Sequence, residues 1–381
     1  IQDYSVIVDA LFGIGLSKPI TGIYEQIINK VNDEQCTVFA IDMPSGVNAS
    51  DGKIMNVCIK ADYTISIGVY KRGLLLYPGC EAAGKITVVD IGFPKEEISN
   101  IKPDVFFYQK EDLDLLPQRK PYSNKGDYGK VLVVAGSKNM SGACYLSAKA
   151  AYKTGAGLVK VLSVEDNRTI LQTQLPEALF ASYDPLKLEC LTEQIMDEIE
   201  WATAIVIGPG IGLDKSSEKL LDLVLVQATV PVVVDADAIT LMSINKKEYK
   251  KSLILTPHVK EMSRLENVGV TKIKEDLITF AKESAKKWNQ VIVLKDARTV
   301  VSNGAEAYVN CSGNNGMATG GSGDVLTGVI AALIAQGMDC FEAAKLGVYI
   351  HGLAGDIAAT KKNCYSLLAG DILDGICEVL K

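Results

Sequence analysis

Short apolar runs alternate with a helix-like segment in the N-terminal part of the chain. The runs Tyr4–Ala10 and Val38–Asp42 each reach an acidic residue and then a Gly or Pro turn, and Ile23–Val31 between them has apolar residues at helical spacing. Two further apolar runs follow at Ala61–Val69 and Ile86–Val89. Strands bury continuous or alternating apolar positions, whereas a surface helix repeats them every three or four residues. The pattern therefore predicts a small domain of the βαβ type.

A polar segment separates this region from the rest of the chain. Phe93–Asn124 is rich in Lys, Asp, Glu and Pro and has no sustained period, so we expect it to be a linker. Repeated βα units beyond it predict a mostly parallel sheet with helices on both faces, and ligands bind such sheets at the C-terminal ends of the strands. The predicted strands are Val131–Ala135, Leu158–Leu162, Ala204–Ile207, Val230–Val234, Leu253–Leu255 and Val291–Leu294, followed by a hairpin of Thr299–Ser302 and Ala305–Val309. The predicted helices are Ala143–Thr154, Ser216–Gln227, Leu277–Trp288 and three that close the chain.

Composition narrows the class of protein. The 381 residues suit about two domains, and 48% hydrophobic residues suffice for ordinary globular cores. A net charge of −7 without a long basic stripe argues against nucleic-acid binding. The longest apolar runs, such as Val325–Ile334, are shorter than the ~20 residues that span a membrane, and no signal peptide is visible. Nine cysteines without a Cys-x-x-Cys pair, and only two histidines, indicate a cytoplasmic protein with reduced thiols and no His-rich metal site.

The most distinctive segment is the glycine-rich run Asn314–Gly328, which leads into an apolar helix predicted over Val325–Gln336. Backbone N–H groups of Gly321–Gly323, together with the positive end of the helix dipole, suit the negative charge of a transferring phosphoryl group. Asp324 then makes sense as a base that takes the proton of a hydroxyl group. A flexible loop with an ordinary helix N-cap is the alternative. No Gly-Lys-Ser/Thr follows the glycines, so the run is not a Walker loop.

This run resembles the Gly-Ser-Gly-Asp signature of ribokinase-like small-molecule kinases and, more closely, the dehydratase half of bifunctional NAD(P)H-hydrate repair enzymes. The resemblance covers roughly Asp104 to the C-terminus. It implies a ribokinase-like α/β domain that phosphorylates the ring hydroxyl of a hydrated nicotinamide with ADP or ATP, aided by Mg²⁺, and then eliminates phosphate. The other segments that carry it are Lys125–Ser137, Ser141–Val161, Gly208–Gly212, Asp235–Ala238, Thr256–Leu265 and Val348–Asp356.

The resemblance also implies roles for single residues. His258 stands where sugar and vitamin kinases have Asn, and an imidazole suits a nicotinamide-like ring. Glu261 is expected to hold Mg²⁺ through water. Asp296 replaces the glycine that usually follows the lysine. The implied contacts to the hydrate are Ala143, Gly212, His258, Arg264 and Asp324, and those to ADP or ATP are Lys295, Asp296, Ala297, Arg298, Thr299, Asn314, Gly321, Ser322 and Gly323.

Two weaker signals can be interpreted as functional or as structural, and a third as structural. Asp235 and Asp237 end a buried strand, where an acid can orient a ligand hydroxyl or a hydrated cation, but Asp237 also suits a helix cap. Lys125–Gly129 is either part of a site or simply the end of the linker. His351 lies in an apolar helix and is predicted to be a packed core histidine.

The N-terminal segments Val8–Leu16 and Ile41–Val47 resemble the epimerase domain of the same repair system. The resemblance implies that Asp9 and Ser45 hold K⁺, since hard oxygen ligands suit such a cation, and that Asp42 lies at the reacting ring. The loop expected to cradle the nucleotide is Gly13, Ile14, Gly15, Leu16, Ser17, Lys18 and Pro19. The family's upstream Asn-Asn-Gly-Gly-Asp-Gly loop has no counterpart in the sequence. We therefore expect a partial Rossmann-like epimerase domain that lacks its N-terminal part and whose activity is in question.

The sequence thus predicts an NAD(P)H-hydrate epimerase-like domain over residues 1–103 and an ADP- or ATP-dependent NAD(P)H-hydrate dehydratase over residues 104–381. Its expected partners are these small molecules, without nucleic acid or membrane, and we expect a homo-oligomer. A ribokinase-like vitamin or sugar kinase is one alternative, and His258 and the epimerase-like first domain count against it. A catalytically silent nucleotide-binding protein is the other, and the intact Gly-Ser-Gly-Asp loop counts against that.

Overall fold

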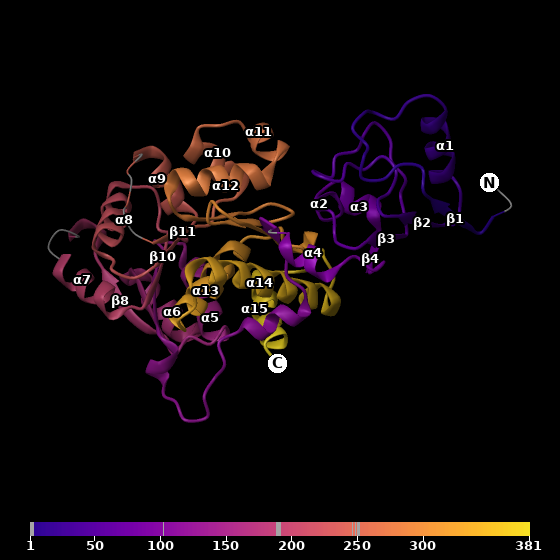
Figure 1. Ribbon diagram of the computed structural model, residues 1–381. Helices are drawn as coiled ribbons and strands as arrows, with labels where there is room; N and C mark the ends of the chain where they lie inside the picture. Colours follow the sequence, from indigo (N-terminus) through magenta and orange to yellow (C-terminus); the bar gives the residue numbers. More distant parts are fainter. Residues whose placement is uncertain (1–3, 102, 188–191, 246, 248, 250–251) are drawn as a thin grey trace. The chain divides into compact units, whose positions relative to one another are not determined.

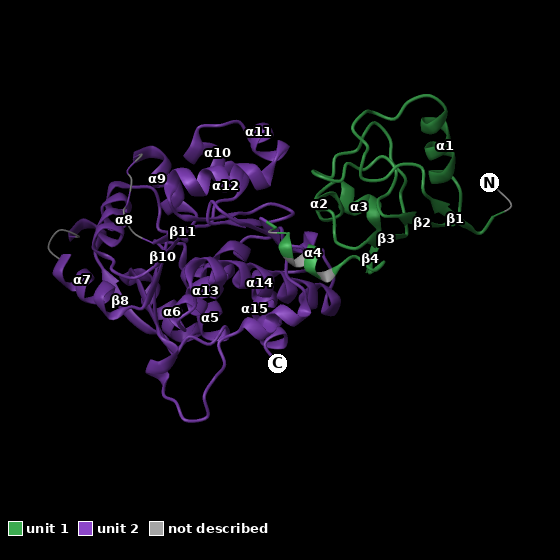
Figure 2. Cartoon of the chain, in the orientation of Figure 1, with its two compact units in different colours: residues 1–103 green, residues 104–381 purple. Residues whose placement is uncertain are grey.

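The chain folds into two compact units, residues 1–103 and 104–381 (Figure 2). The computed structural model describes residues 4–101, 103–187, 192–245, 247, 249 and 252–381. The first unit contains a four-stranded sheet in the order β1-β2-β3-β4, and the second a ten-stranded sheet in the order β5-β14-β13-β12-β11-β10-β9-β6-β7-β8 (Figure 1).

The first unit has the parallel βαβ arrangement that the apolar pattern predicts. All three strand pairs are parallel, and α1 buries Ile28 and Val31 in a cluster that includes Val38 and Ala40 of β2. A second apolar cluster surrounds Met43, just beyond β2. The elements are β1 (Val6–Asp9), α1 (Ile23–Asn32), β2 (Thr37–Ile41), β3 (Tyr63–Ile67), α2 (Arg72–Leu75), α3 (Gly79–Ala83), β4 (Lys85–Val89) and α4 (Lys95–Asn100).

The second unit is an α/β layer structure. Its sheet is parallel except around β13, which pairs antiparallel with β12 and β14. The strands are β5 (Val105–Phe106), β6 (Lys130–Val134), β7 (Leu158–Val164), β8 (Leu179–Tyr183), β9 (Ala204–Ile207), β10 (Val232–Val234), β11 (Leu253–Leu255), β12 (Val291–Leu294), β13 (Val300–Ser302) and β14 (Ala307–Val309). The helices are α5 (Ser141–Lys153), α6 (Arg168–Gln174), α7 (Thr192–Trp201), α8 (Lys215–Gln227), α9 (Asp237–Asn245), α10 (Val259–Glu266), α11 (Val270–Glu275), α12 (Leu277–Trp288), α13 (Ser322–Ala335), α14 (Cys340–Lys361) and α15 (Ala369–Val379).

Helices cover both faces of this sheet. In Figure 1, α10, α11 and α12 lie above the strands, and α13, α14 and α15 lie below them. Strands buried on both faces need apolar side chains at every position, and β9, β10 and β11 are buried throughout. Helix α13 is buried over all of Val325–Ala335, which explains why its sequence is apolar on every side.

The predicted linker over Phe93–Asn124 is wrong in part, because the segment contains α4, β5 and a 3-10 turn over Lys110–Leu115. Strand β5 pairs in parallel with β14, with Phe106 opposite Tyr308. Tyr108, just beyond β5, packs its ring on those of Tyr308 and Tyr349. A two-residue strand has no period of its own, and its partner comes from the far end of the sequence, so no local pattern indicates it.

The central helices α5 and α13 cross at Gly328. A Cβ atom at this glycine would lie 2.1 Å from the Ser147 carbonyl oxygen and 2.8 Å from the Ala150 Cβ. Both distances are below van der Waals contact, so the close approach of the two helices requires a residue without a side chain.

We expect Gly328→Ala to lower the free energy of unfolding by about 1–3 kcal/mol, because the helices must separate to admit the methyl group. Gly370→Ala is the matched control, since Gly370 is exposed in α15 and a Cβ there meets no atom within 4 Å. It should leave stability unchanged or raise it slightly, because alanine favours helix more than glycine does. Urea unfolding followed by tryptophan fluorescence measures both, since both tryptophans, Trp201 and Trp288, belong to the second unit. Equal midpoints for the two variants would contradict the packing argument.

Candidate active site

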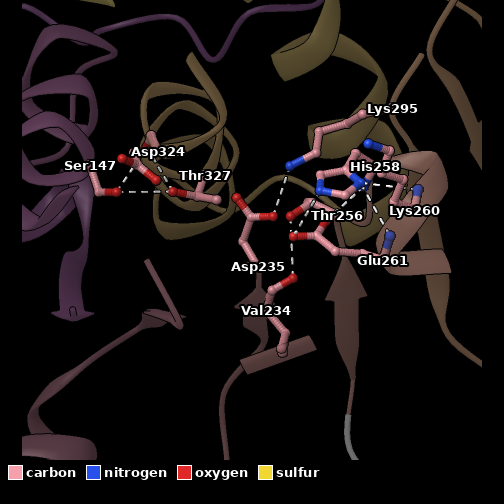
Figure 3. A network of polar contacts seen from close by, with 10 residues as sticks. All are labelled: Ser147, Val234, Asp235, Thr256, His258, Lys260, Glu261, Lys295, Asp324 and Thr327. Atoms are coloured by element: carbon pink, nitrogen blue, oxygen red, sulfur yellow. Dashed lines mark hydrogen bonds and ion pairs between the residues drawn. The ribbon is translucent and has the colours of Figure 1, made fainter. Parts of the chain in front are cut away.

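Three neighbouring parallel strands of the second unit end at polar residues. β10 leads to Asp235, β11 leads to Pro257 and His258, and β12 leads to Lys295. The Lys295 N–H donates to the Pro257 carbonyl oxygen at 2.8 Å, which extends the pairing of β11 and β12. C-terminal ends of adjacent parallel strands share one edge of a sheet, so these side chains converge there (Figure 3).

Asp235 and Lys295 form an ion pair at this edge. The Lys295 Nζ lies 2.8 Å from the Asp235 Oδ1, and the Asp235 side chain is only 2% exposed. Burial by itself lowers the pKa of Lys295, but the carboxylates of Asp235 and Glu261 outweigh it and raise that pKa above its usual value. A Cβ built on Gly323 would lie 3.2 Å from the Lys295 Nζ and 3.3 Å from the Asp235 Oδ2. The ammonium group therefore lies directly against the first turn of α13.

Helix α13 begins at Ser322, three residues before the predicted start at Val325. The apolar pattern marks only the buried part of the helix, and the small polar residues of its first turn carry no such signal. Gly321 precedes the helix with φ of 90°, and a Cβ there would lie 2.4 Å from the Leu146 Cδ1. Asp324 consequently belongs to the first helical turn, where backbone N–H groups lack partners within the helix.

The backbone of Asp324 is held by two buried hydroxyl groups. Ser147 Oγ and Thr327 Oγ1 both donate to the Asp324 carbonyl oxygen, at 2.8 and 2.7 Å (Figure 3). Burial, together with the charge of Asp235, raises the pKa of the Asp324 carboxyl to about 6, against the lowering effect of Lys295. A carboxylate with this pKa suits a general base near neutral pH. Ser147 and Thr327 were not among the predicted site residues, because they support the site from α5 and from within α13.

His258 is the N-cap of α10. Its Nδ1 accepts the N–H groups of Lys260 and Glu261, both at 3.1 Å, and the Glu261 Oε2 accepts the His258 N–H at 2.8 Å. Because Nδ1 accepts, the proton of the neutral ring is on Nε2. Burial and the charges of Lys295 and Arg264 lower the pKa of His258, so the ring is neutral. An Asn oxygen would cap a helix in the same way.

Glu261 is nearly buried beside this cap. Burial raises the pKa of Glu261 to about 7, against the lowering effect of Lys295. Its side chain is 9% exposed, and its Oε1 lies 3.5 Å from the His258 Nε2. A carboxyl group in this setting is ready to ionise when a cation approaches.

The turn Gly208–Gly212 packs against the backbone at Asp235. Gly208, Gly210 and Gly212 all have positive φ, and a Cβ on Gly208 would lie 1.9 Å from the Asp235 carbonyl oxygen. The Gly212 N–H donates to the Asp237 Oδ2 at 2.9 Å. Asp237 thus holds this turn from the first position of α9, in addition to starting that helix. Ala143, at the start of α5, lies against the same turn, because a Cβ on Gly210 would lie 3.2 Å from its own.

The turn after β12 and the loop after β14 hold the residues predicted to contact the nucleotide. The Asn310 N–H donates to the Thr299 carbonyl oxygen at 2.8 Å, and Arg298 Nη1 donates to the Cys311 carbonyl oxygen at 3.1 Å. Asp296, which replaces a glycine of the family pattern, forms an ion pair with Lys274 of α11 at 3.3 Å. The turn and the loop therefore lie side by side.

Lys125–Gly129 lies at the opposite edge of the sheet, where β6 begins. A Cβ on Gly157 would lie 1.7 Å from the Lys125 carbonyl oxygen, and one on Gly129 would lie 2.0 Å from the Ala335 carbonyl oxygen. These distances favour the structural interpretation of this motif, since the glycines serve close packing between β7, α13 and the 3-10 turn over Lys125–Tyr128.

The first unit also brings together residues that the sequence singles out. Asp9 ends β1, and its Oδ2 accepts the Ser45 N–H at 2.7 Å while its Oδ1 accepts the Ser45 hydroxyl at 2.6 Å. Both residues are buried, and the Ser45 Oγ also accepts the Phe12 N–H at 2.8 Å. The result is a compact cluster of oxygen atoms at the C-terminal end of β1.

Asp42 follows β2 in a left-handed backbone conformation, with φ of 68°. Its Oδ1 accepts the Ile67 N–H at 3.0 Å and forms an ion pair with Lys71, which also donates to the Ile67 carbonyl oxygen at 2.7 Å. A non-glycine residue in this conformation is uncommon and often marks a functional position. In the loop Gly13–Pro19, a Cβ on Gly13 or Gly15 would meet no atom within 4 Å, so packing does not require these glycines.

Two kinds of feature, a metal-binding cluster and a membrane-spanning helix, are absent from the residues that the structure describes. No group of three or more His, Cys, Asp and Glu side chains is arranged there to hold a metal ion. None of the helices in the described ranges combines the length and apolar character needed to cross a bilayer.

Both units match known protein families. A family model described as NAD(P)H-hydrate dehydratase matches residues 131–378, and one described as YjeF-related protein N-terminus matches residues 1–73. The bifunctional NAD(P)H-hydrate repair enzymes Nnr of Thermofilum pendens and Moorella thermoacetica are 35% and 37% identical to this chain. In each case the match covers 99% of this chain and 73% of the relative.

Solved structures resemble the second unit. A ribokinase-like superfamily protein from Enterococcus faecalis has a TM-score of 0.67 and 30% identity, over 74% of this chain and 96% of the other. The ADP/ATP-dependent NAD(P)H-hydrate dehydratase from Bacillus subtilis, co-crystallized with ATP/Mg²⁺, has a TM-score of 0.64 and 31% identity, over 72% and 98%. The expected ribokinase-like fold is confirmed.

The elevated pKa of Asp324 predicts a pH-dependent gain in stability for Asp324→Asn. The carboxyl pKa rises from an ordinary 3.8 to about 6, so ionisation destabilises the folded state progressively between these two pH values and fully above them. Asparagine removes that penalty, and the variant should gain about 1–3 kcal/mol over the parent at pH 8 relative to pH 4. Urea unfolding at the two pH values measures it, with exposed Asp374→Asn as the control that should show little change. The same stability difference for Asp324→Asn at both pH values would contradict the burial of the charge.

Proposed function

The chain belongs to the family of bifunctional NAD(P)H-hydrate repair enzymes, and from this we propose how its two units divide the reaction. Residues 104–381 carry out the ADP- or ATP-dependent dehydration of the hydrated dinucleotide. Residues 1–103 form the epimerase-like domain, which interconverts the two epimers of the hydrate. The two family models, which match 131–378 and 1–73, support this division.

One observation carries the dehydratase assignment: a buried carboxyl group with a raised pKa in the first turn of α13, beside an ammonium group. Asp324 takes the proton of the ring hydroxyl as the hydroxyl oxygen bonds to the terminal phosphorus of ADP or ATP and the bond to the leaving nucleotide breaks. The amides of Gly321–Gly323 and the Lys295 ammonium stabilise the charge on the transferring group. The carbon–oxygen bond then breaks and phosphate leaves with its electron pair. The neighbouring ring carbon loses a proton, a carbon–carbon double bond forms, and the reduced nicotinamide is restored.

His258 suits the recognition of the hydrated ring. Its Nδ1 is engaged in the helix cap and its Nε2 lies 3.5 Å from the Glu261 Oε1, while the side chain is 46% exposed. A neutral imidazole can stack on or donate to a carboxamide-bearing ring without repelling the cationic Lys295. We assign Arg264, Gly212 and Ala143 to the same substrate, and the turn Lys295–Thr299 with Asn314 to the nucleotide.

The residues present fit the two cations that the family implies. Glu261 would hold Mg²⁺ through water, and a nearby cation is what ionises a carboxyl whose pKa burial has raised to about 7. When bound, Mg²⁺ would neutralise charge on the donor phosphates. In the first unit, the carboxylate of Asp9, the hydroxyl of Ser45 and the Phe12 carbonyl offer the oxygen atoms that K⁺ prefers. Asp42 would then face the reacting ring, and the loop Gly13–Pro19 would follow the nucleotide.

One assay tests both activities. The protein is incubated with ADP or ATP, Mg²⁺ and a mixture of the two hydrate epimers of NADH, and the absorbance of the reduced ring is followed. A fast phase equal to one epimer reports dehydration, and later consumption of the other epimer, compared in K⁺ and Na⁺, reports epimerisation. A sugar or vitamin kinase would consume nucleotide only with its own substrate and restore no reduced ring, and a silent protein would do neither.

Asp324→Asn should lower turnover by about 10²–10⁴-fold, which is the usual contribution of a positioned base. The dissociation constant for ADP should change by less than a few-fold, because the amide has the same shape and the N–H groups of the turn remain. Turnover is read from restored NADH and ADP binding from titration calorimetry. Asp374→Asn, exposed on α15, should match the parent in both measurements. An Asp324→Asn protein that turns over within a few-fold of the parent would remove Asp324 from the mechanism.

A further inference from the structure

The glycine-rich run, together with Ser312 and Gly313 just before it, lies against one face of α14. The Ser312 hydroxyl donates to the Tyr349 carbonyl oxygen at 3.1 Å. A Cβ on Gly352 would lie 2.1 Å from the Ser312 Oγ, and one on Gly355 would lie 2.2 Å from the Met317 Sδ. The small residues of α14 therefore let the loop rest directly on the helix backbone.

Asp356 binds the first half of this run with both carboxylate oxygens. Its Oδ2 accepts the Gly313 N–H at 2.9 Å, and its Oδ1 accepts the Asn314 Nδ2 at 2.9 Å. The Asn314 Oδ1 in turn accepts the Gly316 N–H at 3.0 Å. Both ends of the Asn314 side-chain amide are thus occupied, and its orientation is fixed by Asp356. Gly313 has φ of 97°, a conformation that glycine adopts without steric cost.

His351 binds the second half of the run. Its Nε2 lies 3.4 Å from the Ser322 Oγ. The residue is 8% exposed, and burial lowers the pKa of His351 to about 4, so the ring is neutral. The prediction of a core histidine is right about burial, but the neighbour of the ring is Ser322, the first residue of α13.

We propose that α14 aligns the two halves of the glycine-rich run through two positioning residues. Asp356 fixes the Asn314 turn beside the nucleotide-binding segment Lys295–Thr299, and His351 fixes Ser322 at the start of α13. Two contacts from one rigid helix set the distance between the place where the nucleotide is held and the place where its terminal phosphoryl group is transferred. This inference rests on the proposed dehydratase function, and neither residue touches the reacting atoms.

Variants at the two contacts should change different kinetic constants. Asp356→Asn keeps the shape but places an amide nitrogen against a donor, so the Asn314 turn loosens. We expect the KM and the dissociation constant for ADP with Mg²⁺ to rise about 10-fold, with kcat within 3-fold of the parent. His351→Leu removes the contact to Ser322, and we expect kcat to fall about 10-fold with little change in the binding of ADP. His351→Gln, whose amide can reach Ser322 again, should recover most of that loss.

Val348→Ala is the matched control, because Val348 is buried in the same helix and has an apolar side chain that makes no hydrogen bond to the run. It lowers stability by creating a small cavity but should leave both KM and kcat unchanged. Circular dichroism establishes that each variant is folded before its kinetics are measured. If Val348→Ala raises the KM for ADP as much as Asp356→Asn does, or if Asp356→Asn changes neither constant, the inference is wrong. A parent that restores no NADH from the hydrate would refute the proposed function instead.

Discussion

The buried pairing of Asp235 with Lys295 is the interaction on which the site of the second unit depends. Two charges at a sheet edge, one of them almost without exposure, persist only because each neutralises the other. Their position beneath Gly323 also sets the charge that Asp324 experiences. Without the ammonium, Asp235 and Asp324 would face each other as like charges, and Asp324 would hold its proton well into the neutral range. The strand order, which puts β10 and β12 on either side of β11, therefore affects the protonation state of Asp324.

Both units build their sites with the same device. An acidic residue follows a parallel strand at its C-terminal end, as Asp9 does after β1, Asp42 after β2 and Asp235 after β10. The strand supplies a rigid base, and the exposed edge of the sheet supplies space for a ligand. In the first unit the carboxylates are held by Ser45 and by Lys71, whereas in the second the partner is a lysine from a neighbouring strand. The two units thus place acidic residues in the same way but give them different partners.

Much of this fold could be predicted where a segment decides its own structure. Ala204–Ile207, Leu253–Leu255 and Val291–Leu294 are strands at the predicted residues, because burial on both faces leaves a continuous apolar run. Asp324 was identifiable from its glycines alone. The contacts that fix it were not, because the Ser147 hydroxyl comes from a helix distant in sequence and a serine in a helix of small residues carries no distinctive pattern. The sequence does not predict strand β5 for the same reason, since pairing with β14, and not its own residue pattern, makes it a strand.

His258 serves the protein through two different atoms. One ring nitrogen closes the first turn of α10, a task that Asn, Asp or Ser side chains also perform, while the other nitrogen lies 3.5 Å from the Glu261 Oε1 and the side chain is 46% exposed. Replacing histidine by asparagine at this position would therefore change the exposed side chain beside Lys295 and Glu261 while the cap of α10 is kept.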